Sequence, residues 1–163
     1  MTIAEFERQY RDVKPNHEYW FGEAVPKAGA TSTHGLLQNI VTMTLDEAGY
    51  KAAPEVTLKI SSDFQPVPDV IATTGRIELP YPTKPVDVVV EILSPEDSFQ
   101  RVLRKCKLYS AWEIPLVVVL DPDGREGWIW EDHTLRPTTA IVLENGRSIS
   151  LDRIFRELDA ELQ

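Results

Sequence analysis

Two carboxylates and one lysine stand out in this sequence because of the residues around them. Glu91 interrupts the hydrophobic run from Val86 to Leu93, and Asp69 begins a short apolar segment. An ionised carboxylate in apolar surroundings must be paired, hydrogen-bonded or bound to a metal. A cation could therefore bring Asp69 and Glu91 together. The alternative is a structural ion pair between Glu91 and an Arg or Lys of the helix that follows.

The positive charge that could act with these carboxylates lies on that following helix. It carries four basic side chains, Arg101, Arg104, Lys105 and Lys107. Lys105 borders the apolar face predicted for this helix, so its ammonium could reach Glu91. The alternative is that the four residues form a solvated basic face that balances an acidic chain.

Apolar periodicity predicts the elements that must position these residues. Helices are expected over residues 33–48, with Ser32 or Thr33 as N-cap, over 98–112, capped by Asp97, and over 151–158. Strands are expected over 55–60, 69–71, 86–93, 116–120, 127–131 and 140–144.

The strand, helix and strand between Val86 and Leu120 form the most secure unit, because two parallel strands need such a crossover. The element order therefore predicts an α/β fold with a mixed β-sheet flanked by helices. Within the strand over 86–93, Asp87, Val89 and Glu91 share one face, whereas Val90 and Ile92 share the other.

Length and composition set limits on the class of protein. The 163 residues predict one domain over 1–163. A single cysteine excludes a disulfide framework and a cysteine-based zinc site, which favours a cytoplasmic location. Neither a membrane span nor a signal peptide is expected. A net charge of -9 argues against nonspecific coating of nucleic acid, although a local nucleic-acid site stays open.

An ordered series of motifs resembles the Uma-type restriction endonuclease family, which belongs to the PD-(D/E)XK nuclease superfamily. The resemblance covers roughly Tyr19 to Trp130, and Phe21-Gly22-Glu23 and His34 match the start of the family pattern. The other motifs are Pro68-Asp69-Val70, Val90-Glu91-Ile92-Leu93-Ser94-Pro95, Lys105 with Tyr109, Ile114-Pro115 and Asp121-Pro122.

The resemblance implies a restriction-endonuclease-like fold and a Mg²⁺-dependent endonuclease that hydrolyses DNA. It implies that Asp69 and Glu91 are ligands of Mg²⁺ or Mn²⁺. Leu93 stands where the superfamily has its usual lysine, and Lys105 is in register to replace it. A hard cation with oxygen ligands and a nearby ammonium is the set that phosphodiester cleavage needs.

Besides Asp69, Glu91 and Lys105, the sequence has two weaker site candidates, and it departs from the family pattern in two places. Glu23 could join the metal site, but a lone Glu after Gly is more often a surface residue. His34 could line the cleft or bind phosphate, although a capping or structural histidine is the more common role. Gln100 and Arg101 fill a region where the family usually has an acidic residue, and Glu113 replaces a glycine.

Three functions share this fold. The first is the Mg²⁺-dependent nuclease. The second is a catalytically inactive nuclease-fold domain that binds nucleic acid or another protein. The third is a structural or regulatory homodimer in which Glu91 and Lys105 form a buried ion pair. A homodimer is also compatible with the first, because two sites cut two strands most simply.

Overall fold

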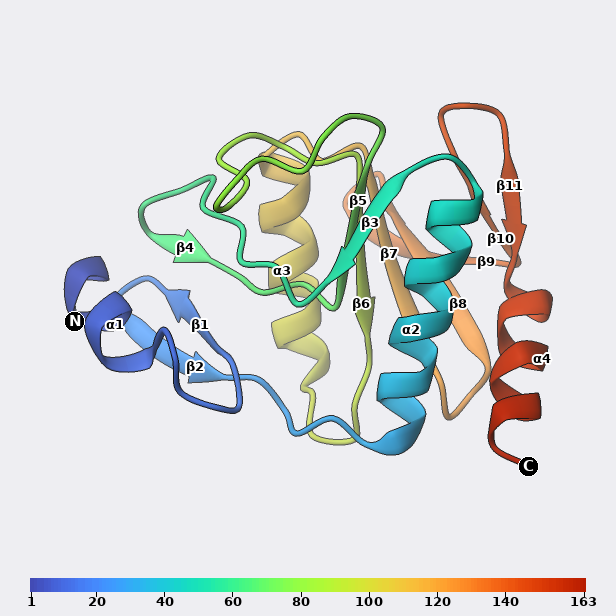
Figure 1. Cartoon of the computed structure of the whole chain (residues 1–163), viewed down its shortest axis with the longest axis horizontal. Helices are drawn as coiled ribbons and strands as arrows, with labels where there is room; N and C mark the ends of the chain where they lie inside the picture. The colour runs from blue at the N-terminus through green and yellow to red at the C-terminus, as the bar shows by residue number, and fades with distance from the viewer.

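The computed structural model describes all residues from 1 to 163 and has a mixed α/β architecture (Figure 1). Its helices are α1 (Ile3–Tyr10), α2 (Ser32–Glu47), α3 (Phe99–Ala111) and α4 (Leu151–Glu161). The main sheet has the order β3-β5-β6-β7-β8-β9. Its strands are β3 (Lys51–Pro54), β5 (Val70–Thr73), β6 (Val88–Ile92), β7 (Leu116–Asp121), β8 (Glu126–Glu131) and β9 (Thr134–Thr138). The predicted mixed sheet is confirmed.

Two smaller sheets lie beside the main one. In the first, β1 (His17–Trp20) pairs with both β2 (Glu23–Pro26) and β4 (Phe64–Gln65). In the second, β10 (Ala140–Val142) pairs with β11 (Ser148–Ser150). No helix has the length and apolar character needed to cross a bilayer.

A separate apolar core packs against each face of the main sheet. Along β6, Val88, Val90 and Ile92 pack in the core that contains residues of α2 and α4. Val89, between them in sequence, packs in the other core with residues of α3. This alternation follows from the pleat of a strand, and it sends the side chain of Glu91 to the same side as α3.

The predicted crossover unit is present, because β6 pairs in parallel with β7 and α3 connects them. On its other edge β6 pairs antiparallel with β5, with Val70 opposite Val90. Extending this register by one residue places Asp69 opposite Glu91. Directly opposite residues of antiparallel strands project to the same face, so both carboxylates point toward α3.

One predicted strand and two predicted caps are wrong. Residues 55–60 form no strand, because Glu55 has a left-handed φ of 55° that ends β3 at Pro54. Thr31, not Ser32 or Thr33, caps α2 by accepting a hydrogen bond from the His34 N–H. Ser98 caps α3, whereas the carboxylate of Asp97 accepts a hydrogen bond from the Ser94 N–H.

Candidate active site

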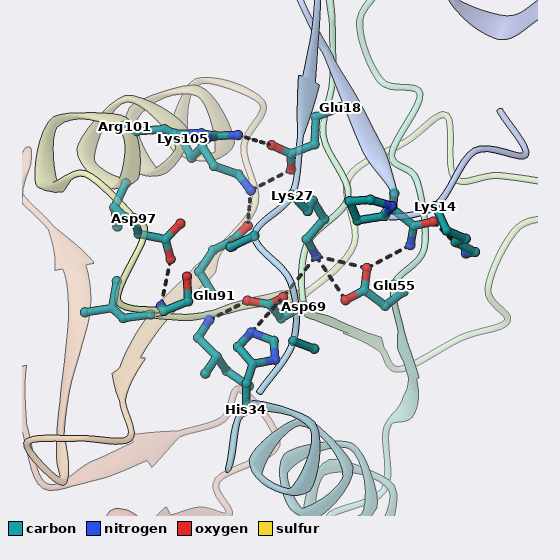
Figure 2. Close-up of a pocket in the computed structure, with 18 residues that line it drawn as sticks. Lys14, Glu18, Lys27, His34, Glu55, Asp69, Glu91, Asp97, Arg101 and Lys105 are labelled. Carbon is teal, nitrogen blue, oxygen red and sulfur yellow. Dashed lines mark hydrogen bonds and ion pairs between the residues drawn. The ribbon is translucent and has the colours of Figure 1, made fainter. Parts of the chain in front are cut away.

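A polar pocket of about 180 Å³ lies where β1, β5, β6 and α3 approach one another (Figure 2). A pocket of this volume has room for a phosphate-sized group with a few water molecules, since liquid water occupies about 30 Å³ per molecule. Its charged and histidine side chains are Lys14, Glu18, Lys27, His34, Glu55, Asp69, Glu91, Asp97, Arg101 and Lys105.

Asp69 is surrounded by donors and positive charge. Its Oδ2 accepts a hydrogen bond of 2.6 Å from the Ile92 N–H, and its Oδ1 lies 3.0 Å from the Lys27 ammonium. The Nε2 atom of His34 lies 3.4 Å from the same Oδ1. Burial by itself would raise the pKa of Asp69, but His34, Lys27 and the Ile92 N–H together hold that pKa well below its ordinary range. Asp69 is therefore ionised at neutral pH.

Glu91 is buried among fewer compensating groups. Its Oε1 lies 2.8 Å from the Lys105 ammonium and accepts a hydrogen bond of 2.6 Å from the Tyr109 hydroxyl. Burial raises the pKa of Glu91 to about 7, because the attraction of Lys105 only partly offsets the loss of water and the repulsion from Asp69 and Glu18. Near neutral pH this carboxyl group can therefore gain or lose a proton.

Lys105 is the basic residue that α3 turns inward. The side chain is buried, and its ammonium lies between Glu18 Oε1 at 2.7 Å and Glu91 Oε1 at 2.8 Å. Burial alone would lower the pKa of Lys105, but the two carboxylates raise it above its ordinary value. Lys105 thus stays positively charged, and the ion pair with Glu91 expected as the structural alternative is present.

Glu18 is a member of the site that the sequence interpretation missed. It is almost completely buried on β1, and its Oε1 also accepts a hydrogen bond of 2.9 Å from the Val67 N–H. Its Oε2 accepts a hydrogen bond of 3.0 Å from the Trp20 indole. Burial opposes ionisation of Glu18, but Lys105, the Val67 N–H and Lys27 lower its pKa. The signal for Glu18 in the sequence is weak, because it precedes Tyr19 and Trp20 but follows the polar residues Asn16 and His17 and so interrupts no apolar run, unlike Glu91.

Lys27, Glu55 and Gln38 form a second missed group. The Lys27 ammonium contacts both carboxylate oxygens of Glu55, at 3.1 and 3.0 Å, in addition to Asp69. The Gln38 amide donates to Glu55 Oε1 at 3.0 Å and to the backbone oxygen of Asp69 at 2.7 Å. No motif marks these residues, because loops and a helix far apart in the sequence bring them together.

The two weaker candidates have different positions. His34 lines the pocket from the first turn of α2, and its contact with Asp69 outweighs burial and raises its pKa. Glu23 is exposed on β2 and does not line the pocket.

Two pocket atoms, His34 Nδ1 and Ser94 Oγ, are buried without a hydrogen-bond partner. The pocket therefore has polar groups left over for a ligand or water.

The carboxylates of Asp69 and Glu91 are of the kind and the number that a hard cation such as Mg²⁺ binds. Asp69 and Glu91 offer oxygen ligands from the same face of the sheet. No group of three or more His, Cys, Asp or Glu side chains converges as a complete metal cage. Mg²⁺ is commonly held by one or two carboxylates, with water and substrate phosphate as its other ligands. Asp69 and Glu91 therefore fit a Mg²⁺ or Mn²⁺ site in which two carboxylates bind the ion and water and substrate phosphate complete its coordination.

Comparisons with known proteins identify the family of the chain and agree with its fold. The model of the Uma2 family, described as "Putative restriction endonuclease", matches residues 3–163, so the chain belongs to that family. A crystal structure from Anabaena variabilis ATCC 29413, described as "a putative nuclease belonging to DUF820", superposes with a TM-score of 0.77. The two are 18% identical, over 97% of this chain and 99% of that one, which establishes a shared fold.

A more distant likeness is to a DrdV-DNA complex solved by cryo-electron microscopy. It has a TM-score of 0.42 and 12% identity, over 74% of this chain and 11% of that chain. The comparison with curated proteins gave no match.

Proposed function

We propose that the protein is a Mg²⁺-dependent endonuclease that hydrolyses phosphodiester bonds of DNA. The observation that carries this proposal is the placement of Asp69 and Glu91 opposite each other on one face of the sheet, with Lys105 2.8 Å from Glu91. Membership of a family described as "Putative restriction endonuclease" supports it.

Each of these residues would have a distinct part in hydrolysis. Asp69, held ionised by its donors, and Glu91 would hold the cation. Bound Mg²⁺ would neutralise charge on the scissile phosphate and lower the pKa of a bound water. The permanently charged Lys105 would orient the attacking water or stabilise the negative charge that develops on the phosphate. Glu18 would keep the Lys105 ammonium in place.

Arginines beside the pocket support an anionic polymer as the substrate. Arg101 lines the pocket, and its guanidinium lies 5.4 Å from the Trp20 ring centroid. The guanidinium of Arg104 lies 4.9 Å from the ring of Phe21, which is 48% exposed. Trp20 is buried, so Phe21 is the exposed ring of the two. An arginine beside an exposed aromatic ring is a combination that binds phosphates and stacks on bases.

The proposed function is tested by cleavage of supercoiled plasmid DNA with Mg²⁺ and with EDTA. Glu91→Gln should reduce the Mg²⁺-dependent rate by about 100-fold or more, since it removes charge that the cation needs. Glu23→Gln is the matched control, because Glu23 is exposed outside the pocket, and should cut like the wild type. Equal rates for both variants and the wild type would refute the assignment of Glu91.

The second candidate, a catalytically inactive binding module, is favoured by one specific observation. Both proposed metal ligands already have lysine partners, Lys27 on Asp69 and Lys105 on Glu91. A protein that binds DNA but cleaves none with Mg²⁺ or Mn²⁺ would fit this second function.

A further inference from the structure

The ammonium of Lys27 contacts Asp69, one of the two carboxylates that would have to be available to bind the metal. It is 3.0 Å from Asp69 Oδ1, and the side chain is only 13% exposed (Figure 2). Burial alone would lower the pKa of Lys27, but Asp69, Glu91 and Glu55 raise it. Lys27 is thus a buried, charged group that neutralises Asp69, and nothing in the proposed hydrolysis uses it.

Lys27 and Lys105 differ in how firmly they are held. Lys105 projects from the middle of α3, and its second partner, Glu18, is buried. Lys27 lies in the irregular segment between β2 and α2, where its N–H donates to the Asn16 oxygen at 2.8 Å. The side chain of Lys27 can therefore move without disturbing a helix or strand.

Glu55, the second partner of Lys27, can bind the Lys27 ammonium without Asp69. Glu55 contacts Lys27 through both carboxylate oxygens. It is fixed independently by amide donors, Asn16 Nδ2 to Oε2 at 3.0 Å and Gln38 Nε2 to Oε1 at 3.0 Å. A short movement away from Asp69 would leave Lys27 paired with Glu55.

We infer that Lys27 is an internal cation that competes with the divalent metal for Asp69, and that Glu55 retains the Lys27 ammonium when the metal binds. This inference rests on the proposed function. Two cations on one carboxylate oxygen repel each other strongly in a site that water screens poorly. Metal binding therefore includes the cost of separating Lys27 from Asp69, and Lys27 sets the metal concentration at which the site fills.

The competition is tested by calorimetric titration of the full chain with Mn²⁺ alone. Lys27→Met removes the competing charge but keeps a long side chain, and should tighten Mn²⁺ binding by about tenfold or more. Lys27→Arg keeps the charge and should show no tightening. Lys14→Met is the matched control: Lys14 lines the same pocket but donates to Asn16 Oδ1 at 2.7 Å and contacts neither Asp69 nor Glu55. Its Mn²⁺ affinity should stay within about threefold of the wild type, since it removes only a more distant charge.

A second readout covers the case in which Lys27→Met folds poorly. A ligand that binds only the folded state raises the melting temperature, and it does so more strongly as its affinity grows. Mn²⁺ should therefore raise the melting temperature of Lys27→Met more than that of the wild type.

The possible failures are distinguishable. Mn²⁺ binding that Asp69→Asn abolishes but Lys27→Met leaves unchanged or weakens would overturn the inference and leave the metal site intact. The same increase in affinity for Lys27→Met and Lys14→Met would also overturn it, because the effect would then be one of general charge. No Mn²⁺ binding by any variant would overturn both the inference and the metal dependence of the proposed function.

Discussion

At the scale of single residues, the surroundings of Asp69 and Glu91 act on the two carboxyl groups in opposite directions. Both are buried, and burial favours the neutral form. For Asp69, His34, Lys27 and a backbone N–H outweigh that effect and lower the pKa. For Glu91 the burial prevails, and the pKa rises to about 7. One member of the pair is thus firmly ionised, whereas the other exchanges its proton near neutral pH.

The raised pKa of Glu91 predicts a stability effect in the absence of metal. Between the ordinary pKa of 4.5 and about 7, the folded protein binds more protons at Glu91 than the unfolded chain does. Stability from this group therefore falls as pH rises through that range. Glu91→Gln should lose this dependence and be more stable than the wild type above pH 7, by about 1–3 kcal/mol. Urea denaturation from pH 4.5 to 8 measures it; parallel curves for the two proteins would contradict the prediction.

Asp69→Asn should have the opposite effect. The folded pKa of Asp69 is lowered, so its stabilisation is present above its unfolded pKa of 3.8 and is lost as pH falls through the folded value. Asparagine cannot pair with Lys27, and we expect a loss of about 2 kcal/mol at pH 7. The difference should shrink when both proteins are unfolded in urea below pH 4. A variant as stable as the wild type at pH 7 would argue that the ion pair with Lys27 contributes nothing.

At the scale of elements, α3 determines which basic residue enters the site. Ser98 caps its N-terminus, and the buried residues Val102, Lys105, Cys106 and Tyr109 form its inner face. Lys105 and Tyr109 are one helical turn apart and both contact Glu91. Lys107 lies about 200° further round the helix from Lys105 and is exposed.

This geometry predicts that two neighbouring lysines differ in importance. Lys105→Met should lower the single-turnover rate of DNA cleavage by about 100-fold at saturating DNA, at low and at moderate salt. Lys107→Met should stay near the wild-type rate, with any loss of affinity reduced by added salt. Circular dichroism must accompany the assay, because Lys105→Met leaves Glu18 and Glu91 without their cation, which can cost about 3–5 kcal/mol of stability. Equal losses for the two variants would remove Lys105 from the catalytic residues.

The elements also show where prediction from the sequence reached its limit. The unit β6-α3-β7 was predictable because continuous apolar runs and a helical period lie close together in the sequence. The strands β1 and β2 were not predicted, since each has only four residues. They pair with each other across a short turn, and β1 also pairs with the distant β4. Glu18 and Lys27 depend on this small sheet, so the partners of Lys105 and Asp69 were missed together with it.

At the scale of the whole molecule, the main sheet separates two cores and leaves the site at one end of β5 and β6. The core on the α2 and α4 side contains no site carboxylate. Tyr109, by contrast, packs in the core on the α3 side and also donates to Glu91. The site therefore borders the α3 core, but two of its groups come from the other side of the sheet: His34 lies on α2, and the Ile92 N–H that donates to Asp69 belongs to a residue of the α2 and α4 core.

Gly127 offers a test of how closely β8 packs against the core on the α4 side. A Cβ at Gly127 would lie 2.5 Å from Leu151 Cδ1 and 2.9 Å from Leu120 Cδ2, both in the α4-side core. Gly127→Ala should destabilise the fold by about 1–3 kcal/mol through overpacking. Gly35→Ala, where a Cβ within α2 meets nothing within 4 Å, should instead stabilise it by about 0.5–1 kcal/mol. Thermal melts compare the two; an unchanged or raised melting temperature for Gly127→Ala would contradict the close packing of β8 against α4.

The central claim is that Asp69 and Glu91 together hold a divalent cation. It is tested most directly by anomalous diffraction from crystals soaked in Mn²⁺, with wild-type and Glu91→Gln protein measured alike. The account predicts a strong anomalous peak in the wild-type pocket, in contact with the carboxylates of both Asp69 and Glu91, and its loss in Glu91→Gln. A wild-type pocket without a peak, with Lys27 still on Asp69 and Lys105 still on Glu91, would contradict it.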